Sequence, residues 1–194
     1  MSSSSHPPDP RRSASKQASE LEKGYDKEWK ETVYFPFILE HYKKSLNWYF
    51  ISMNGNVTFD TILNNQLFPN HGPIPWDWTA ISMNPNMTMD IVKQHPFRPW
   101  NLDAIDRNTS IVMNKPVEIK MVESKHRKLT PKMIEKAPNT PWGLTDICSN
   151  PNLTMDLIRR FPEKPWDWDR ISLLTFELDR LSFVNAKMQV RLVT

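Results

Sequence analysis

The chain repeats one pattern of hydrophobic and polar positions. In the stretch "PWDWTAISMNPNMTMDIVKQHP", Trp76, Ala80 and Met83 fall on one helical face, and Ile81 lies beside them. Asn84-Pro85 follows, and a residue that precedes proline avoids the α conformation. The pattern therefore predicts a short helix that ends at Asn84.

A second short helix is predicted directly after this stop. Thr88 stands where an N-cap is needed, and Asp90 lies where a negative charge favours the positive end of a helix. Pro96 marks the end of the segment. Each helix has roughly two to three turns, which is too short to be stable alone, so neighbouring units must pack against one another.

The same phrase recurs at a fixed spacing. Trp100 follows Trp76 by 24 residues, and Trp166 follows Trp142 by 24. An earlier copy begins near Trp48 and is separated from the next by 24 residues plus a six-residue insertion. A period of this length is typical of tandem structural repeats.

The middle of the chain follows the pattern less closely. "SIVMNKPVEIKMV" aligns with "AISMNPNMTMDIV" if Ile111 takes the place of Ile81, and Thr130 then takes the place of Thr88. On this alignment, and with a period of 24 residues, the chain carries about four or five copies of the repeat.

These observations predict an all-α fold, in which short helical hairpins of about 24 residues stack in a small solenoid-like array. The predicted organisation is a disordered N-terminal tail (1–22), an aromatic N-terminal cap (23–47), a repeat array (48–172) with an irregular insertion (103–128), and a C-terminal cap (173–194).

The repeated phrase Pro-Trp-Asp-Trp, Ile-Ser, Asn-Pro-Asn, Thr, Asp resembles short tandem repeats in proteins of large eukaryotic DNA viruses, of the iridovirus, marseillevirus and mimivirus types. The resemblance covers roughly residues 46–172, about two thirds of the chain. The sequence departs from the pattern of these repeats at Gly55, at Gly143-Leu144 and through 103–128. The resemblance implies a viral protein and brings no catalytic residues with it.

Composition narrows the class further. Seventeen prolines against four glycines indicate many short elements joined by stiff turns. A single cysteine excludes an intrachain disulfide and favours a reducing compartment such as the host cell cytoplasm. A net charge of +3 disfavours nucleic acid as the main partner, and no apolar run is long enough to predict a membrane span.

No motif predicts an enzyme, a cofactor or a metal. The tryptophans recur at helical spacing beside isoleucine, which favours core packing over a platform for bases or sugars. Cys148 stands in the place of Ser82, a small position of the repeat, and a nucleophilic role is the weaker alternative. The five histidines lack the spacing of metal ligands.

Two functions remain, and both are non-enzymatic. The first is a protein-protein interaction adaptor or scaffold that binds a host or viral protein. The second is a virion component, such as a minor capsid, cementing or internal particle protein. The segment 115–136 carries a local charge of +4, which predicts docking of an acidic partner. The candidate partner-binding residues are Lys120, Lys125, Arg127, Lys128 and Lys132, with Tyr34, Phe35 and Phe37 as a second set.

Overall fold

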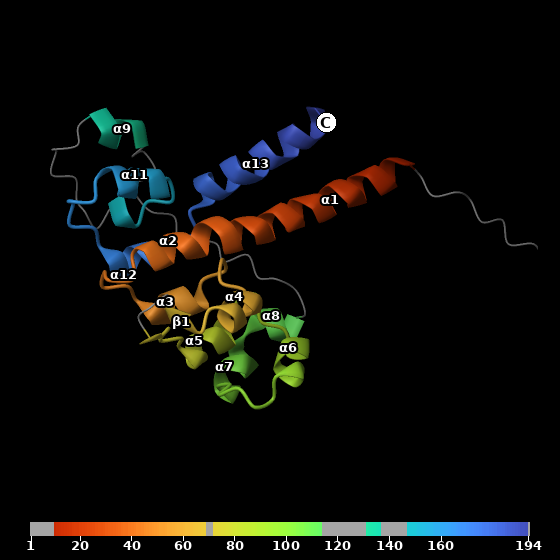
Figure 1. Cartoon of the computed structure of the whole chain (residues 1–194). Coiled ribbons are helices and arrows are strands. Elements are labelled where there is room, and N and C mark those ends of the chain that lie inside the picture. Colours follow the sequence, from red (N-terminus) through yellow and green to blue (C-terminus); the bar gives the residue numbers. More distant parts are fainter. Residues whose placement is uncertain (1–9, 69–71, 114–130, 137–146, 194) are drawn as a thin grey trace, which may run out of the picture.

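The structure is a computed structural model that describes residues 10–68, 72–113, 131–136 and 147–193 (Figure 1). The predicted all-α class is confirmed, since helices account for most of these residues. The helical elements are α1 (Pro10–Trp29), the π-helical turn η1 (Lys30–Tyr34), α2 (Phe35–Glu40), α3 (Trp48–Met53), α4 (Phe59–Asn64), α5 (Trp78–Met83), α6 (Met89–Gln94), α7 (Leu102–Arg107), α8 (Thr109–Met113), α9 (Pro131–Lys136), α11 (Met155–Arg160), α12 (Trp168–Ile171) and α13 (Glu177–Val193).

One small antiparallel hairpin interrupts this pattern. It consists of β1 (Leu67–Phe68) and β2 (Gly72–Pro73), with Leu67 opposite Pro73 and Phe68 opposite Gly72. Gly72 has φ of +89°, a conformation that residues with a side chain rarely adopt. The hairpin occupies the six-residue insertion between the first two clear copies of the repeat.

The predicted caps and stops of the short helices are confirmed. The hydroxyls of Thr58, Thr88 and Thr154 each accept a hydrogen bond from the backbone N–H three residues later, at the start of α4, α6 and α11. Asn54 and Asn84 end α3 and α5 in an extended conformation. Local chemistry thus fixes where the first helix of a unit ends and where the second begins.

The start of the first helix differs from the prediction. The helix does not begin at Pro75-Trp76 but at Trp78, because the Asp77 carboxylate accepts the N–H of Ala80 at 2.8 Å and acts as the N-cap. Asn47, Asn101 and Asp167 cap α3, α7 and α12 in the same way. The tryptophan two residues before Trp78, and its equivalents, lie in the turn before the helix. Their indole N–H groups donate to a backbone carbonyl at the end of the previous helix. These bonds run from Trp76 to the carbonyl of Asn65 (2.8 Å), from Trp100 to His95 (2.8 Å) and from Trp166 to Phe161 (2.9 Å).

Buried asparagines connect three of the units to the unit before them in space. The Asn84 side chain is fully buried, and its amide N–H group donates to the backbone carbonyls of Ser52, Asn54 and Val57 at 2.8, 3.0 and 3.1 Å. Its oxygen accepts the N–H of Asn86 at 2.8 Å, which holds the turn after α5. Helices end with carbonyls that lack intrahelical partners, and here the next unit supplies the donor.

Asn108 makes the equivalent contact one unit further along, to the carbonyls of Ser82 and Asn84 at 2.9 and 3.1 Å. This contact corrects the predicted alignment, because Asn108, and with it Ile105, takes the repeat position that had been assigned six residues later, at Ile111. Asp106 in place of serine, and Thr109 in place of proline, obscure the phrase in the sequence.

Asn54 makes the same contact, but its partners come from the other end of the chain. Its amide donates to the carbonyls of Ser172 and Leu174 at 3.2 and 3.1 Å. Asn56 adds a bond to the carbonyl of Thr175 at 2.9 Å. The unit that precedes α3 in space is therefore α12, which follows it in sequence by more than a hundred residues.

A second series of hydrogen bonds gives the same order. The small residue after each repeat isoleucine accepts the backbone N–H of the cap residue of the next unit. The pairs are the Cys148 sulfur with Asp167 (3.3 Å), and the hydroxyls of Ser172 with Asn47 (3.1 Å), Ser52 with Asp77 (3.0 Å) and Ser82 with Asn101 (3.0 Å).

The described residues thus form five layers, numbered here by their order in space. Layer 1 holds residues 147–150 and α11, layer 2 holds α12 and α2, layer 3 holds α3 and α4, layer 4 holds α5 and α6, and layer 5 holds α7 and α8. Figure 1 shows α2 between α11 and α3. The next described helix along the chain, α9, is joined to α11 of layer 1 at the other end of the stack by an ion pair between Glu135 and Arg160.

Layer 2 is built from both ends of the chain. The turn after α2 has the same two backbone hydrogen bonds as the turns after α6 and α11. After α2, the Lys44 N–H donates to the carbonyl of His41 (2.9 Å) and the Leu46 N–H to that of Lys44 (2.7 Å). The equivalent bonds are Arg98 to His95 (3.2 Å) and Trp100 to Arg98 (2.7 Å) after α6, and Lys164 to Phe161 (3.2 Å) and Trp166 to Lys164 (2.8 Å) after α11. Phe35 stacks on Trp76 at 5.6 Å between ring centroids, as Phe59 of layer 3 stacks on Trp100 at 5.8 Å. α2 is therefore the second helix of a repeat whose first helix is α12.

Three of the predicted domain assignments are corrected by this topology. The segments 23–47 and 173–194 were expected to cover opposite ends of the array, but α2 and the residues just before α13, Leu174 and Phe176, lie in its interior. Residues 10–22 were expected to be disordered, but they belong to α1. The segment from 11 to 29 has no proline, and Leu21, Tyr25 and Trp29 recur at helical spacing toward α13. Residues 1–9 lie outside the described part.

The buried asparagine makes a sharp prediction about stability. Replacing Asn84 with Asp removes the donor and places a carboxylate against three carbonyl oxygens, so the free energy of unfolding should fall by about 3 kcal/mol or more. The deficit should shrink in acid, where the carboxyl takes up a proton and regains one donor. Urea unfolding measures both effects.

Asn185, which is exposed in the middle of α13, provides the matched control. Asn185→Asp should change the free energy of unfolding by no more than about 0.5 kcal/mol. Equal effects at the two positions would show that the Asn84 contacts do not hold layers 3 and 4 together.

Candidate interaction surfaces

The aromatic residues predicted to meet a partner lie in the core instead. Tyr34 and Phe37 are fully buried, and Phe35 is nearly so. Phe37 packs edge-on against Phe176 at 5.3 Å. Burial raises the pKa of the Tyr34 phenol, and its hydroxyl has no hydrogen-bond partner among the described residues. These side chains hold layer 2 to its neighbours and are closed to a partner.

The basic candidates fall mainly outside the described residues. Lys120, Lys125, Arg127 and Lys128 lie there, so their role stays a prediction. Lys132 is exposed on α9, where an ion pair between Glu135 and Arg160 joins α9 to α11. The structure brings Lys132 near layer 1 and does not connect it with Tyr34, Phe35 and Phe37.

Cys148 lies in the core, where it contributes a hydrogen bond between two layers. Its thiol is buried, and its sulfur accepts the N–H of Asp167, the position that Ser52, Ser82 and Ser172 fill with a hydroxyl in other layers. Burial raises the pKa of the thiol to about 11, so it is protonated at neutral pH. A protonated, buried thiol is a poor nucleophile.

The described histidines also pack on rings. His41 lies 4.8 Å from the ring of Trp168, and its Nδ1 is 2.8 Å from the carbonyl of Phe37. His95 lies 4.7 Å from Phe59. Within the described residues, no group of three or more His, Cys, Asp or Glu side chains is arranged to hold a metal ion.

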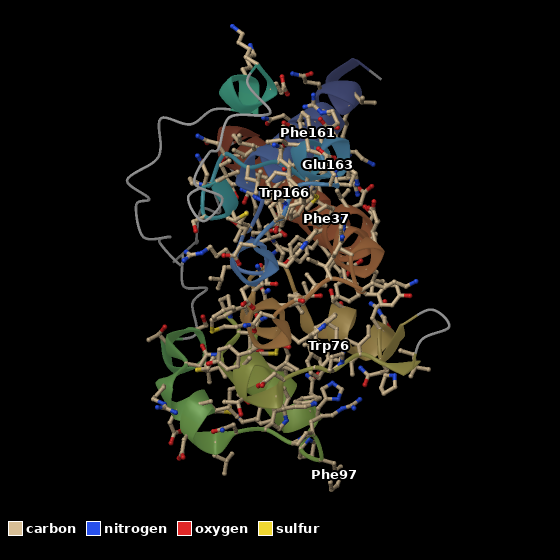
Figure 2. The ribbon with its side chains drawn as sticks, turned by 90° about the vertical axis from the view of Figure 1, so that its left-hand side faces the viewer. Phe37, Trp76, Phe97, Phe161, Glu163 and Trp166 are labelled. Atoms are coloured by element: carbon tan, nitrogen blue, oxygen red, sulfur yellow. The ribbon has the colours of Figure 1, made fainter. Side chains whose placement is uncertain are left out.

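The turns that connect one layer to the next form a continuous edge, here called the turn edge. It is formed by Glu163 and Lys164 after layer 1, Lys43 and Lys44 after layer 2, the β1–β2 hairpin after layer 3, and Phe97 and Arg98 after layer 4. The first residue of these pairs differs from turn to turn, and the second is a cation. Figure 2 shows Glu163 toward one end of the molecule and Phe97 at the other.

Phe97 is the most exposed large hydrophobic side chain among the described residues, at 100% of its possible surface, and Leu67 of the hairpin is 65% exposed. Beside Phe97, the Arg98 guanidinium lies over the ring of Trp78 at 5.8 Å. The turn edge thus combines apolar tips with cations. Alignment of the turns after α2, α6 and α11 could have found this surface, because the position of Lys43, Phe97 and Glu163 changes while the next position keeps a cation.

The pair α1 and α13 forms a second surface, here called the arm. The two helices lie side by side and extend away from the stack (Figure 1). They run antiparallel, and ion pairs join Arg180 to Asp26 at 2.9 Å and Lys187 to Glu28 at 2.5 Å. An open groove of about 710 Å³ follows the arm. Its lining residues are Tyr25, Phe183, Ala186, Lys187, Val190 and Arg191.

Comparison with family models, curated proteins and solved structures finds no match for this chain. Among the described residues, no helix combines the length and the apolar character needed to cross a membrane.

The structural role of Cys148 can be tested by two substitutions. Cys148→Ser should leave the free energy of unfolding within about 0.5 kcal/mol of the wild-type value, because serine fills the same position in three other layers. Cys148→Val is similar in size but cannot accept the Asp167 N–H, so it should cost about 1 kcal/mol. Thermal or urea unfolding distinguishes the two. A valine variant as stable as the serine variant would remove the sulfur from the series of interlayer bonds.

Proposed function

We propose that the protein is a non-enzymatic helical-repeat adaptor, a short solenoid of a large DNA virus that binds a host or viral protein in the cytoplasm of the infected cell. The observation that carries the proposal is that the repeat has two kinds of position, one that joins the layers and one that is exposed and variable. Asn, Ser and Trp positions recur because they join the layers, while the exposed position held by Glu163, Lys43 and Phe97 changes in charge and polarity from layer to layer.

The chemistry of the turn edge supports a protein partner. Lys43 and Lys44 are exposed, and Arg98 and Lys164 add cations at the positions equivalent to Lys44. Phe97 supplies an exposed aromatic anchor of the kind that is enriched at the centres of protein interfaces. A partner with an acidic rim and an apolar pocket fits this combination better than a nucleic acid, because the net charge is only +3.

Support for a viral setting comes from the resemblance of the repeated phrase. A virion role would use the same surfaces, with the partner in the particle rather than in the cell. Mass spectrometry of purified particles separates these settings: stoichiometric presence favours the virion component, and absence with abundance in infected cytoplasm favours the adaptor.

The adaptor proposal predicts that the turn edge selects the partner. A variant carrying Lys43→Glu, Lys44→Glu and Phe97→Ser should recover much less of the partners that wild-type protein captures from infected cells, because it loses both the cations and the apolar anchor. Binding of the wild-type protein should also weaken as salt rises, since screening shortens to about 8 Å at physiological ionic strength. Quantitative affinity capture measures both.

Two further variants control this experiment. Lys16→Glu with Lys23→Glu makes the same change of charge on the exposed face of α1 and should leave capture unchanged. Lys125→Glu with Arg127→Glu and Lys128→Glu tests the basic segment predicted from the sequence. If all variants are folded and capture the same partners in the same amounts, the adaptor proposal is wrong.

A further inference from the structure

The groove of the arm leaves an apolar surface open beside cations. Val190 is 66% exposed in the groove, and Phe183 and Tyr25 lie half-buried along it. Lys187 and Arg191 line the same groove, and no acidic side chain does. Lys187 is already paired with Glu28 at 2.5 Å, so the ligand that suits the groove offers an apolar stripe with a carboxylate beside Arg191.

The N-terminal part of α1 also extends beyond the region where the arm is packed. Residues 15–20 of α1 are helical, yet every one of them is exposed. A helical segment without packing is marginal in water, so this part of α1 lacks the tertiary contacts that stabilise the rest. Packing against another helix would supply them.

We propose that the occupant of the groove is the arm of a second copy of this chain, so that two arms pack antiparallel about a two-fold axis as a four-helix bundle. The acidic residue that the groove requires is present on α1 itself, one turn before Tyr25. Glu22 is exposed there, on a helix that runs antiparallel to α13, while Glu20 nearby is paired with Lys23 at 2.9 Å.

The antiparallel arrangement brings the two charges to the same level of the arm. Tyr25 shares the groove with Lys187 and Arg191, so Glu22 lies about one turn away from that level. A two-fold axis near Val190 therefore places Glu22 of each copy beside the basic residues of the other copy's α13. Both signs occur on one surface, which is the self-complementarity that a symmetric dimer needs.

This inference is independent of the adaptor proposal, because it uses the arm and leaves the turn edge exposed. The test is the mass of the purified chain in solution, measured by light scattering and by sedimentation over a wide range of protein concentration. Wild-type protein should be a dimer that dissociates on dilution. A wild-type chain that is monomeric at every concentration overturns the proposal.

Variants then locate the interface. Val190→Glu adds a charge at an exposed position, so it should keep the fold by circular dichroism and raise the dimer dissociation constant at least about tenfold. Leu67→Glu is the matched control, since Leu67 has nearly the same exposed fraction, 65%, but lies on the hairpin. Val190→Glu with the dissociation constant of the wild-type protein would contradict the arm as the interface.

Charge exchange tests the proposed partner directly. Glu22→Lys and Arg191→Glu should each weaken the dimer, because each brings like charges together across the axis. The double variant restores opposite charges and should recover most of the affinity. If the double variant is weaker than both single variants, a helix from a different protein, and not a second copy, is the better occupant of the groove, and the proposal fails.

Discussion

The structure depends on a buried asparagine amide that donates to the carbonyl oxygens at the end of a helix in the neighbouring layer. Helices of about six residues leave most of their backbone groups without intrahelical partners, so a stack of them has many polar groups to satisfy. Asn54, Asn84 and Asn108 solve this problem three times with the same geometry. The amide serves both layers, because its oxygen also holds its own turn through the N–H two residues later. Ionised aspartate has no donor, and serine has only one donor hydrogen where the asparagine amide has two.

These bonds also decide the order of the layers. Most repeat proteins stack in chain order, so each unit depends on its sequence neighbours. Here α2 and α12, from opposite ends of the chain, share layer 2, and contacts such as Asn54 with Ser172 span more than a hundred residues. The N- and C-terminal segments are therefore structural parts of the stack, and what remains of them, α1 and α13, leaves it as a single arm. Because α2 and α12 pair in layer 2, the molecule has two separate surfaces, the turn edge along the layers and the groove of the arm. These two surfaces can bind different partners.

Short-range chemistry made much of this fold predictable. Thr88 and Thr154 as caps, Asn84 as a stop, and the packing of the tryptophans follow from residues that act within a few positions of one another. The order of the layers was not predictable in the same way, because it rests on weak similarity between "FILEHYKKSLNW" and "IVKQHPFRPWNL", in which His41 and Asn47 stand for His95 and Asn101. That similarity would also have placed Phe35 and Phe37 in the core. An exposed site such as Phe97 gives no hydrophobic period, so it is visible only when the turns of the repeats are aligned and their side chains compared.

The central claim, that α12 lies directly against α3, can be tested by cross-linking. The Asn47 and Asp169 side chains are 3.0 Å apart at Nδ2 and Oδ1, and the equivalent pair Asn101 and Thr79 is 3.2 Å apart at Nδ2 and Oγ1. Cysteines introduced at each pair in a Cys148→Ser background, treated with a short bifunctional thiol reagent, should cross-link within one chain at similar rates. Cysteines at Asn47 and Asp103, which lie in layers 3 and 5, should not. If the Asn47 and Asp169 positions fail to cross-link while the Asn101 and Thr79 positions succeed, the layers stack in chain order and the closure through layer 2 is wrong.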